Sequence, residues 1–159
     1  MRIRSFPPIA NKHSRILILG TMPSIKSLEK KQYYGHPQNH FWPVMAAVCG
    51  VDLSQDYEKR KRMLLKNNIA LWDVVRSCKR AGSADSAIKN AKYNNLKKFL
   101  LLHPKIKKAF CNGQISYKLI EKAKLPVNMN VEALPSTSPA FTKPLSWKIR
   151  RWKQEIKKL

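Results

Sequence analysis

Short apolar runs alternate along the chain with stretches in which apolar side chains recur at helical spacing. A continuous apolar run predicts a buried strand at 15–20, and shorter apolar stretches predict further strands at 69–75, 106–113 and 131–134. The helical spacing predicts helices at 41–48, 54–66, 94–103 and 114–124, and a basic helix at 146–159. Strands that alternate with helices in this way indicate an α/β fold, in which helices cover both faces of a parallel sheet.

Two segments lack either pattern. Residues 1–14 are expected to be an extended entry segment, because consecutive prolines oppose a helix there. Residues 76–90 contain Gly82 and several small polar residues, so we expect an exposed loop. No stretch has the composition of a linker, and 159 residues suit one core, so residues 1–159 are predicted to form a single domain.

Polar, irregular segments follow three of the predicted strands, at Gly20–Ser24, Val75–Asn90 and Leu134–Phe141. In a parallel sheet the carboxyl ends of the strands open on one edge, where ligands of open α/β sheets bind. Ser24 or Ser27 is expected to cap a short turn after the first strand. The sequence therefore predicts a binding site at this edge.

The segment Tyr33–Trp42 combines four aromatic residues, two histidines and two side-chain amides within ten residues. Aromatic rings offer flat faces for stacking, and amides read donor and acceptor edges. Gly35 and Pro37 favour an irregular backbone between them. This composition predicts a pocket for a flat, polar heterocycle. The alternative is a surface loop whose aromatic side chains fill the core.

The charge is strongly unbalanced, with 32 Lys and Arg against 9 Asp and Glu and a formal net charge of +23. Such a charge usually indicates binding to a polyanion, most often nucleic acid or an anionic membrane surface. A lysine-rich solvated surface without a partner is the alternative. No apolar run reaches the roughly 20 residues of a membrane span, and no secretory signal is apparent at the amino terminus. The three cysteines are widely spaced, which fits isolated thiols in a reducing, intracellular compartment.

Several kinds of site are not supported by the sequence. It has no G-x-G-x-x-G motif and no P-loop. His36 and His40 are four residues apart, but no Glu lies between them and Pro37 opposes a helix, so a zinc site is not expected. Ser24 and Ser136 lack the surroundings of a nucleophile elbow. Acidic residues are too scarce to favour a two-carboxylate glycosidase.

Three motifs resemble those of the uracil-DNA glycosylase superfamily, in the right order and over nearly the whole chain. They are Gly20-Thr21-Met22-Pro23-Ser24, Tyr34-Gly35-His36-Pro37-Gln38-Asn39-His40-Phe41-Trp42 and Leu134-Pro135-Ser136-Thr137-Ser138-Pro139. The hypoxanthine-DNA glycosylase branch is the most similar, and the mismatch-specific uracil-DNA glycosylases are near relatives. The resemblance implies a three-layer α/β/α fold with a central four-stranded parallel sheet. It also implies that a base flips out of duplex DNA into a pocket.

The resemblance also implies roles for individual residues. Met22 and Leu134 stand where the superfamily often has Asn or Asp, and His, so both usual catalytic groups are missing. The hypoxanthine branch relies instead on the Asn of the aromatic motif, which is Asn39 here. Tyr34 stands where relatives stack the flipped base. The implied pocket residues are Gly20, Thr21, Met22, Pro23, Ser24, Tyr34, His36 and Phe41.

The last motif corresponds to the loop that enters the minor groove and fills the gap left by the flipped base. Basic residues follow it closely in the sequence. Together they give the expected DNA contacts Ser136, Thr137, Ser138, Pro139, Lys143, Lys148 and Arg151.

The sequence therefore predicts a monofunctional DNA glycosylase that acts as a monomer on double-stranded DNA. Hypoxanthine is the expected base and uracil the alternative; a non-catalytic, basic nucleic-acid-binding protein is the rival from another class. We expect no metal, no cofactor and no membrane partner. Asp73 or Asp85 would assist catalysis only if folded into the pocket, and a structural role is the commoner use of such an acid.

Overall fold

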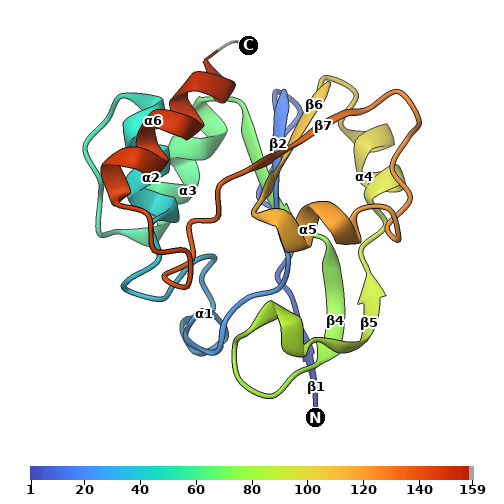
Figure 1. Ribbon diagram of the computed structural model, residues 1–159. Coiled ribbons are helices and arrows are strands. Elements are labelled where there is room, and N and C mark those ends of the chain that lie inside the picture. Colours follow the sequence, from blue (N-terminus) through green and yellow to red (C-terminus); the bar gives the residue numbers. More distant parts are fainter. Residues whose placement is uncertain (158–159) are drawn as a thin grey trace.

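Four parallel strands form the centre of the protein in a computed structural model that describes residues 1–157 (Figure 1). The strands are β2 (Ile16–Gly20), β3 (Ile69–Asp73), β6 (Lys108–Asn112) and β7 (Asn130–Leu134), in the order β3-β2-β6-β7. Neighbouring strands pair in parallel throughout. The predicted four-stranded parallel sheet is therefore confirmed, and its carboxyl ends meet at one edge.

Both faces of this sheet are buried. On β2, Leu17 and Leu19 pack on one face with Leu96, whereas Ile18 packs on the other with Trp152. All of these side chains are fully buried. A strand that is covered on both faces has no position for a polar side chain, which is why β2 forms a continuous apolar run.

Helices cover the two faces and complete three layers (Figure 1). One face carries α2 (Phe41–Cys49), α3 (Tyr57–Lys66) and α6 (Leu145–Ile156), with buried Trp42 and Trp152 among the core residues. The other face carries α4 (Leu96–Leu102) and α5 (Gln114–Leu119). The predicted α/β/α arrangement is confirmed.

A second sheet was not expected from the sequence. It consists of β1 (Arg2–Arg4), β4 (Val75–Lys79) and β5 (Lys89–Tyr93), antiparallel and in the order β1-β4-β5. The prediction of one exposed loop over 76–90 is therefore wrong, and a short 3-10 helix, η1 (Asp85–Ala87), also lies within that segment. The residues of β5 are exposed or only partly buried, so the apolar pattern that would reveal a strand is weak there.

The predicted strand 69–75 is split, because the chain leaves the central sheet at Val74 and enters the second one at Val75. The backbone N–H groups of Val74 and Val75 donate to the carbonyl oxygens of Gly20 and Thr21, at 2.9 and 3.1 Å. These bonds fix the start of β4 against the end of β2. The second sheet thus extends from the edge at which a site was predicted.

Several helix boundaries follow local capping. Ser24 starts α1 (Ile25–Lys30), where its hydroxyl accepts from the Ser27 N–H at 3.2 Å, so the predicted cap is confirmed. Gly50 ends α2 at a φ of 69°, in the left-handed region that glycine adopts readily. The helix expected at 114–124 is shorter and ends at Leu119. Part of the helix expected at 146–159 lies outside the described residues.

Candidate active site

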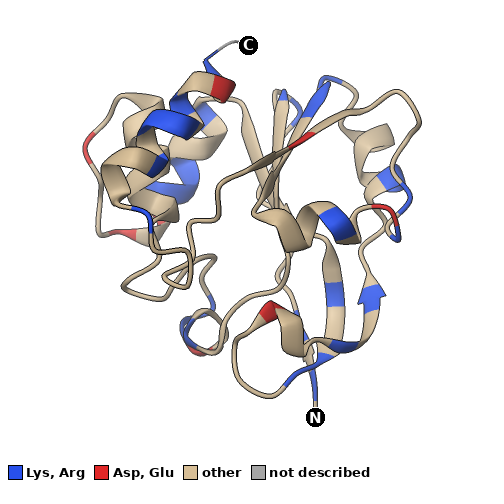
Figure 2. Ribbon diagram, viewed as in Figure 1, with Lys and Arg blue, Asp and Glu red and all other residues tan. Residues whose placement is uncertain are grey.

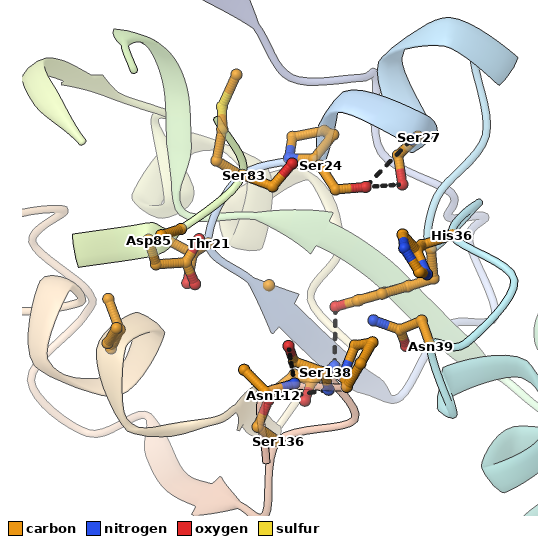
Figure 3. A pocket seen from close by; sticks show the side chains of 18 of the residues that line it. Thr21, Ser24, Ser27, His36, Asn39, Ser83, Asp85, Asn112, Ser136 and Ser138 are labelled. Atoms are coloured by element: carbon orange, nitrogen blue, oxygen red, sulfur yellow. Dashed lines mark hydrogen bonds between the residues drawn. The ribbon is translucent and has the colours of Figure 1, made fainter. Parts of the chain in front are cut away.

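A cavity of about 640 Å³ opens at the carboxyl ends of all four central strands. Such a volume lies within the range of about 300–1,000 Å³ that is usual for small-molecule sites. The strand ends contribute Gly20, Asp73 and Asn112 to its lining, and Ser136 follows two residues after β7. Figure 3 shows side chains from these and other segments arranged around one central space.

The segment after β2 lines the cavity as predicted, with each of Gly20, Thr21, Met22, Pro23 and Ser24 on its wall. Gly20 has no room for a side chain. A Cβ atom there would lie 2.5 Å from Asp73 Oδ1 and 2.7 Å from the Tyr34 hydroxyl oxygen. Gly20 therefore allows a carboxyl group and a phenol to come together on the floor of the cavity.

Tyr34 connects the aromatic segment to this floor. Its backbone has a φ of 53°, and its ring stacks on Phe41 with the centroids 4.1 Å apart. Its hydroxyl accepts a hydrogen bond from Asn112 Nδ2 at 3.1 Å. Burial, with the charge of Asp73 as a smaller cause, raises the pKa of Tyr34, so the phenol stays protonated at neutral pH.

The aromatic segment serves both the cavity and the core. Tyr34, His36 and Asn39 line the cavity. Phe41, however, is fully buried behind Tyr34 and does not line the cavity, so its assignment to the pocket is corrected. Trp42 is likewise buried, and its Nε1 donates to the Tyr33 carbonyl oxygen at 2.8 Å. The core therefore holds the segment in place from behind.

Asn39 is held so that one end of its amide is occupied and the other faces the cavity. Its backbone N–H donates to His36 O at 3.0 Å, and its Oδ1 accepts from the Phe41 N–H at 2.9 Å. Figure 3 shows the Nδ2 end pointing into the space opposite Thr21 and Asp85. Within residues 1–157 this Nδ2 has no hydrogen-bond partner, so it is available to donate to a bound group.

Asn112 is a site residue that the sequence reasoning missed. Its Nδ2 donates to the Tyr34 hydroxyl and to Thr137 Oγ1, the latter at 2.9 Å, and its Oδ1 accepts from Thr137 N at 3.0 Å. One side chain thus ties together the aromatic segment and the loop after β7. Its position at the end of a predicted strand was the signal available in the sequence.

Thr137 anchors the loop after β7 rather than pointing outward. Its side chain is fully buried, and its carbonyl oxygen accepts from the His40 N–H at 2.9 Å. Ser136, Ser138 and Pro139, by contrast, line the cavity. The motif is thus divided between an internal anchor and residues that border the opening.

Lys148 does not fit its predicted role as a phosphate contact. Its side chain is fully buried. Its Nζ donates to the Ser138 carbonyl oxygen at 3.2 Å and lies 5.6 Å from the centroid of the Phe141 ring. Burial lowers the pKa of Lys148 from its ordinary value. Lys148 therefore supports the loop from below. Lys143 and Arg151 are exposed and flank the Trp147 ring, at 5.2 and 5.7 Å from its centroid.

Both candidate acids fold into the cavity wall. Asp73 is 4% exposed, and its Oδ2 is a buried atom with no hydrogen-bond partner in the described part of the chain. Burial, and next the charge of Asp85, raise the pKa of Asp73 to about 7, although Arg80 opposes the shift. The pKa of Asp85 is also raised, mainly by burial, while a hydrogen bond with Thr21 and the charge of Arg80 oppose it.

The basic residues are distributed over most elements (Figure 2). In the picture, α6 and the β4-β5 strands both carry Lys or Arg, and acidic residues are sparse. Among residues 1–157, no three His, Cys, Asp and Glu side chains gather as a metal site would require. Over the same range, no helix has the length and apolarity needed to cross a bilayer.

Comparisons with known proteins agree with this arrangement. The family model of the Uracil DNA glycosylase superfamily matches residues 7–157. A hypoxanthine DNA glycosylase from Methanosarcina barkeri is 35% identical over 161 residues, which cover 99% of this chain and 100% of that relative. A hypoxanthine DNA glycosylase from Methanosarcina acetivorans is 39% identical over 141 residues, which cover 86% of this chain and 87% of the relative.

A solved structure is similar over the same length. The solution NMR structure of a candidate uracil DNA glycosylase from Methanosarcina acetivorans matches with a TM-score of 0.82 and 32% sequence identity, covering 97% of this chain and 98% of that one. The fold, the cavity at the strand ends and the family match therefore agree. The chain belongs to the uracil DNA glycosylase superfamily.

Proposed function

We propose that this protein is a monofunctional DNA glycosylase of base excision repair, which hydrolyses the N-glycosidic bond of hypoxanthine in deoxyinosine. Two relatives named hypoxanthine DNA glycosylase, similar over most of their length, support the choice of base. The observation that carries the proposal is the unpartnered Asn39 Nδ2, directed into a cavity that would hold a single base. A merely basic DNA-binding protein would need neither the cavity nor the oriented amide.

The base enters the cavity after it has flipped out of the duplex, because its glycosidic bond is otherwise enclosed in the helix. Tyr34 offers a ring for stacking, and Phe41 fixes that ring from behind. Pro23 and Met22 add apolar wall on the side of β2. These residues would hold a flat heterocycle between the strand ends and the aromatic segment.

Breaking the bond builds positive charge on the sugar and negative charge on the departing base. The N–H groups of Asn39 would donate to the base, or to the attacking water, at the moment when charge develops. Because Oδ1 is already bound to the Phe41 N–H, the amide is oriented before the substrate arrives. Such preorganised donors stabilise a transition state at little cost in reorganisation.

Double-stranded DNA is the expected partner, bound by one copy of the chain as a single domain inside the cell. Ser138 and Pro139 border the cavity, where they would fill the gap that the flipped base leaves. The exposed Lys143 and Arg151 follow closely in the sequence and would contact phosphates. Lys148 would serve indirectly, by holding the Ser138 carbonyl oxygen.

The test is a set of duplexes that each contain one hypoxanthine, uracil or xanthine, with an undamaged duplex as control. We expect single-turnover release of free hypoxanthine, with abasic DNA as the other product and no strand cleavage. Addition of a chelator should leave the rate unchanged. Faster release of uracil would support the alternative base, in line with the similar candidate uracil DNA glycosylase. Tight binding without release of any base would support the non-catalytic rival.

A further inference from the structure

Asp73 stands out among the acidic side chains of the cavity because its Oδ2 is buried without a hydrogen-bond partner in the described residues. It is 4% exposed, and Oδ2 is one of only a few buried side-chain nitrogen and oxygen atoms in residues 1–157 that have no hydrogen-bond partner. Leaving a buried polar atom unpaired costs about 1–3 kcal/mol. A buried, unpaired oxygen in the wall of a binding cavity therefore points to a partner that arrives with the substrate.

The position of Asp73 suits contact with a base. It ends β3, beside the end of β2, and its Oδ1 is so close to Gly20 that a methyl group there would lie 2.5 Å from it. The Tyr34 hydroxyl approaches the same point. Glycine at position 20 thus leaves room for the carboxyl group in the cavity wall, since a Cβ atom there would collide with it.

The surroundings of Asp73 favour its protonated form. Burial raises its pKa to about 7, and the negative charge of Asp85 contributes to the increase. Arg80 acts in the opposite direction. Its Nη2 donates to the Pro23 carbonyl oxygen at 2.6 Å and its Nε to the Gly82 carbonyl oxygen at 2.8 Å, whereas its Nη1 is buried without a partner in residues 1–157. The titratable and charged groups that act on Asp73 or respond to it are Asp85, Arg80, Tyr33, Tyr34 and Tyr57.

We propose that Asp73 is a catalytic acid, which donates the proton of its carboxyl group to a ring nitrogen of the departing purine. This inference rests on the proposed function and assigns a further residue to it. It resolves a difficulty in that function, because the amide of Asn39 can form a hydrogen bond to the base but has no proton to give up. A protonated carboxylic acid can do both.

The step balances without any further reactant. The electron pair of the bond between C1′ and the base nitrogen goes to the base, and the proton of Asp73 moves to another nitrogen of that base, which leaves neutral. Water adds to the positively charged C1′ and loses its proton. The products are neutral hypoxanthine and an abasic sugar. Asp73 is left as a carboxylate and takes up a proton from solvent before the next cycle.

Single-turnover rates measured on a hypoxanthine duplex from about pH 5.5 to about pH 9 test this assignment, since a required acid loses activity above its pKa. We expect the parent rate to fall about tenfold per pH unit at the alkaline end. Asp73→Asn keeps the shape of the side chain but has no transferable proton. Its rate should be lower by about 100-fold or more at neutral pH, and the alkaline decline should disappear.

A second variant separates an acid from a merely structural residue. Asp85→Asn removes the negative charge that raises the pKa of Asp73, so the alkaline decline should begin at a lower pH. A structural role for Asp73 predicts no such shift. His36 also lines the cavity, and His36→Gln serves as the matched control: whatever it does to the maximal rate, the decline should stay where it is.

Three outcomes overturn the inference: a parent rate that is constant across the range, an Asp73→Asn protein that retains the alkaline decline, or a decline that follows His36. If the parent protein cleaves deoxyinosine DNA, any of these removes Asp73 alone and leaves the proposed function standing. If the parent releases no hypoxanthine at any pH, the proposed function itself has failed. A thermal melt of each variant shows that the folded protein is being compared.

Discussion

Replacing Asn39 tests the proposed site most directly, because the structure divides the amide into two parts with different tasks. Oδ1 accepts a hydrogen bond from the Phe41 N–H at the start of α2, whereas Nδ2 faces the cavity. Asn39→Ala removes both. Asn39→Asp retains an oxygen for the Phe41 N–H but has no N–H group to donate. The two variants therefore separate the support of the helix from the contact with the base or water.

The expected magnitudes differ enough to be distinguished. Loss of a capping oxygen costs about 1 kcal/mol of the free energy of unfolding. Loss of one preorganised donor at a transition state lowers the rate by about 100- to 1000-fold. We therefore expect Asn39→Ala to lose about 1 kcal/mol and at least about 100-fold in rate, and Asn39→Asp to lose the rate while keeping most of the stability.

The assay is single-turnover release of hypoxanthine from a duplex, measured beside a denaturant titration and duplex binding for each variant. The α2 start has other support, since His40 N donates to the Thr137 carbonyl oxygen and Val44 N to His40 O, both at 2.9 Å. Both variants should consequently fold. An Asn39→Ala protein that is less stable but releases the base at the parent rate would show that Asn39 is only a helix cap.

Four further results are expected. Affinity for undamaged duplex should fall steeply with salt, because the logarithm of the binding constant falls by about 0.9 per log unit of salt concentration for each phosphate contacted. Arg151→Met should therefore reduce this slope by about one contact. Lys148→Met should leave the slope unchanged, because that lysine is buried. The same Lys148→Met should slow cleavage of duplex more than of single strands, since Nζ supports the Ser138 carbonyl oxygen of the loop that borders the cavity; equal slowing on both would argue against this. Asn112→Ala should likewise slow cleavage of duplex more than of single strands, because it removes the hydrogen bonds that hold Thr137. Finally, the folded-state pKa of Asp73 is raised above its unfolded value, so its contribution to stability is present below about pH 4 and is lost as the pH rises through about 7. Asp73→Asn should therefore be more stable than the parent above pH 7, by up to about 4 kcal/mol at 1.36 kcal/mol per pKa unit. Denaturant titrations at several pH values would measure this difference.

The central fold was predictable because its sequence pattern has a single simple cause. Strands covered on both faces favour apolar side chains, so β2 is a continuous apolar run that needs no context to be recognised, and β6 has an apolar centre at Ala109–Cys111. The second sheet was missed for the opposite reason. Its β5 strand is exposed or only partly buried and rich in lysine, and its pairing with β4 depends on residues that the sequence pattern does not single out.

The site was predictable in part. Residues 20–24 and Asn39 were expected from their motifs, and they line the cavity. Phe41 and Lys148 were assigned to the base and to DNA by residue type and position, but both are fully buried and support other residues. Residue type alone does not distinguish an aromatic or lysine side chain that contacts a ligand from one that supports the segment contacting the ligand.

The sequence alone thus determined the α/β class, the edge of the sheet that carries the site, and the residues whose motifs mark the superfamily. Those properties follow from local spacing and from the common direction of parallel strands. The tertiary structure alone decided that Asp73 lies unpaired in the cavity wall, that Asn112 joins Tyr34 to Thr137, and that Lys148 is buried. Hydrogen bonding and burial depend on which segments meet in space, and residues 34, 73, 112 and 137 are brought together only by folding.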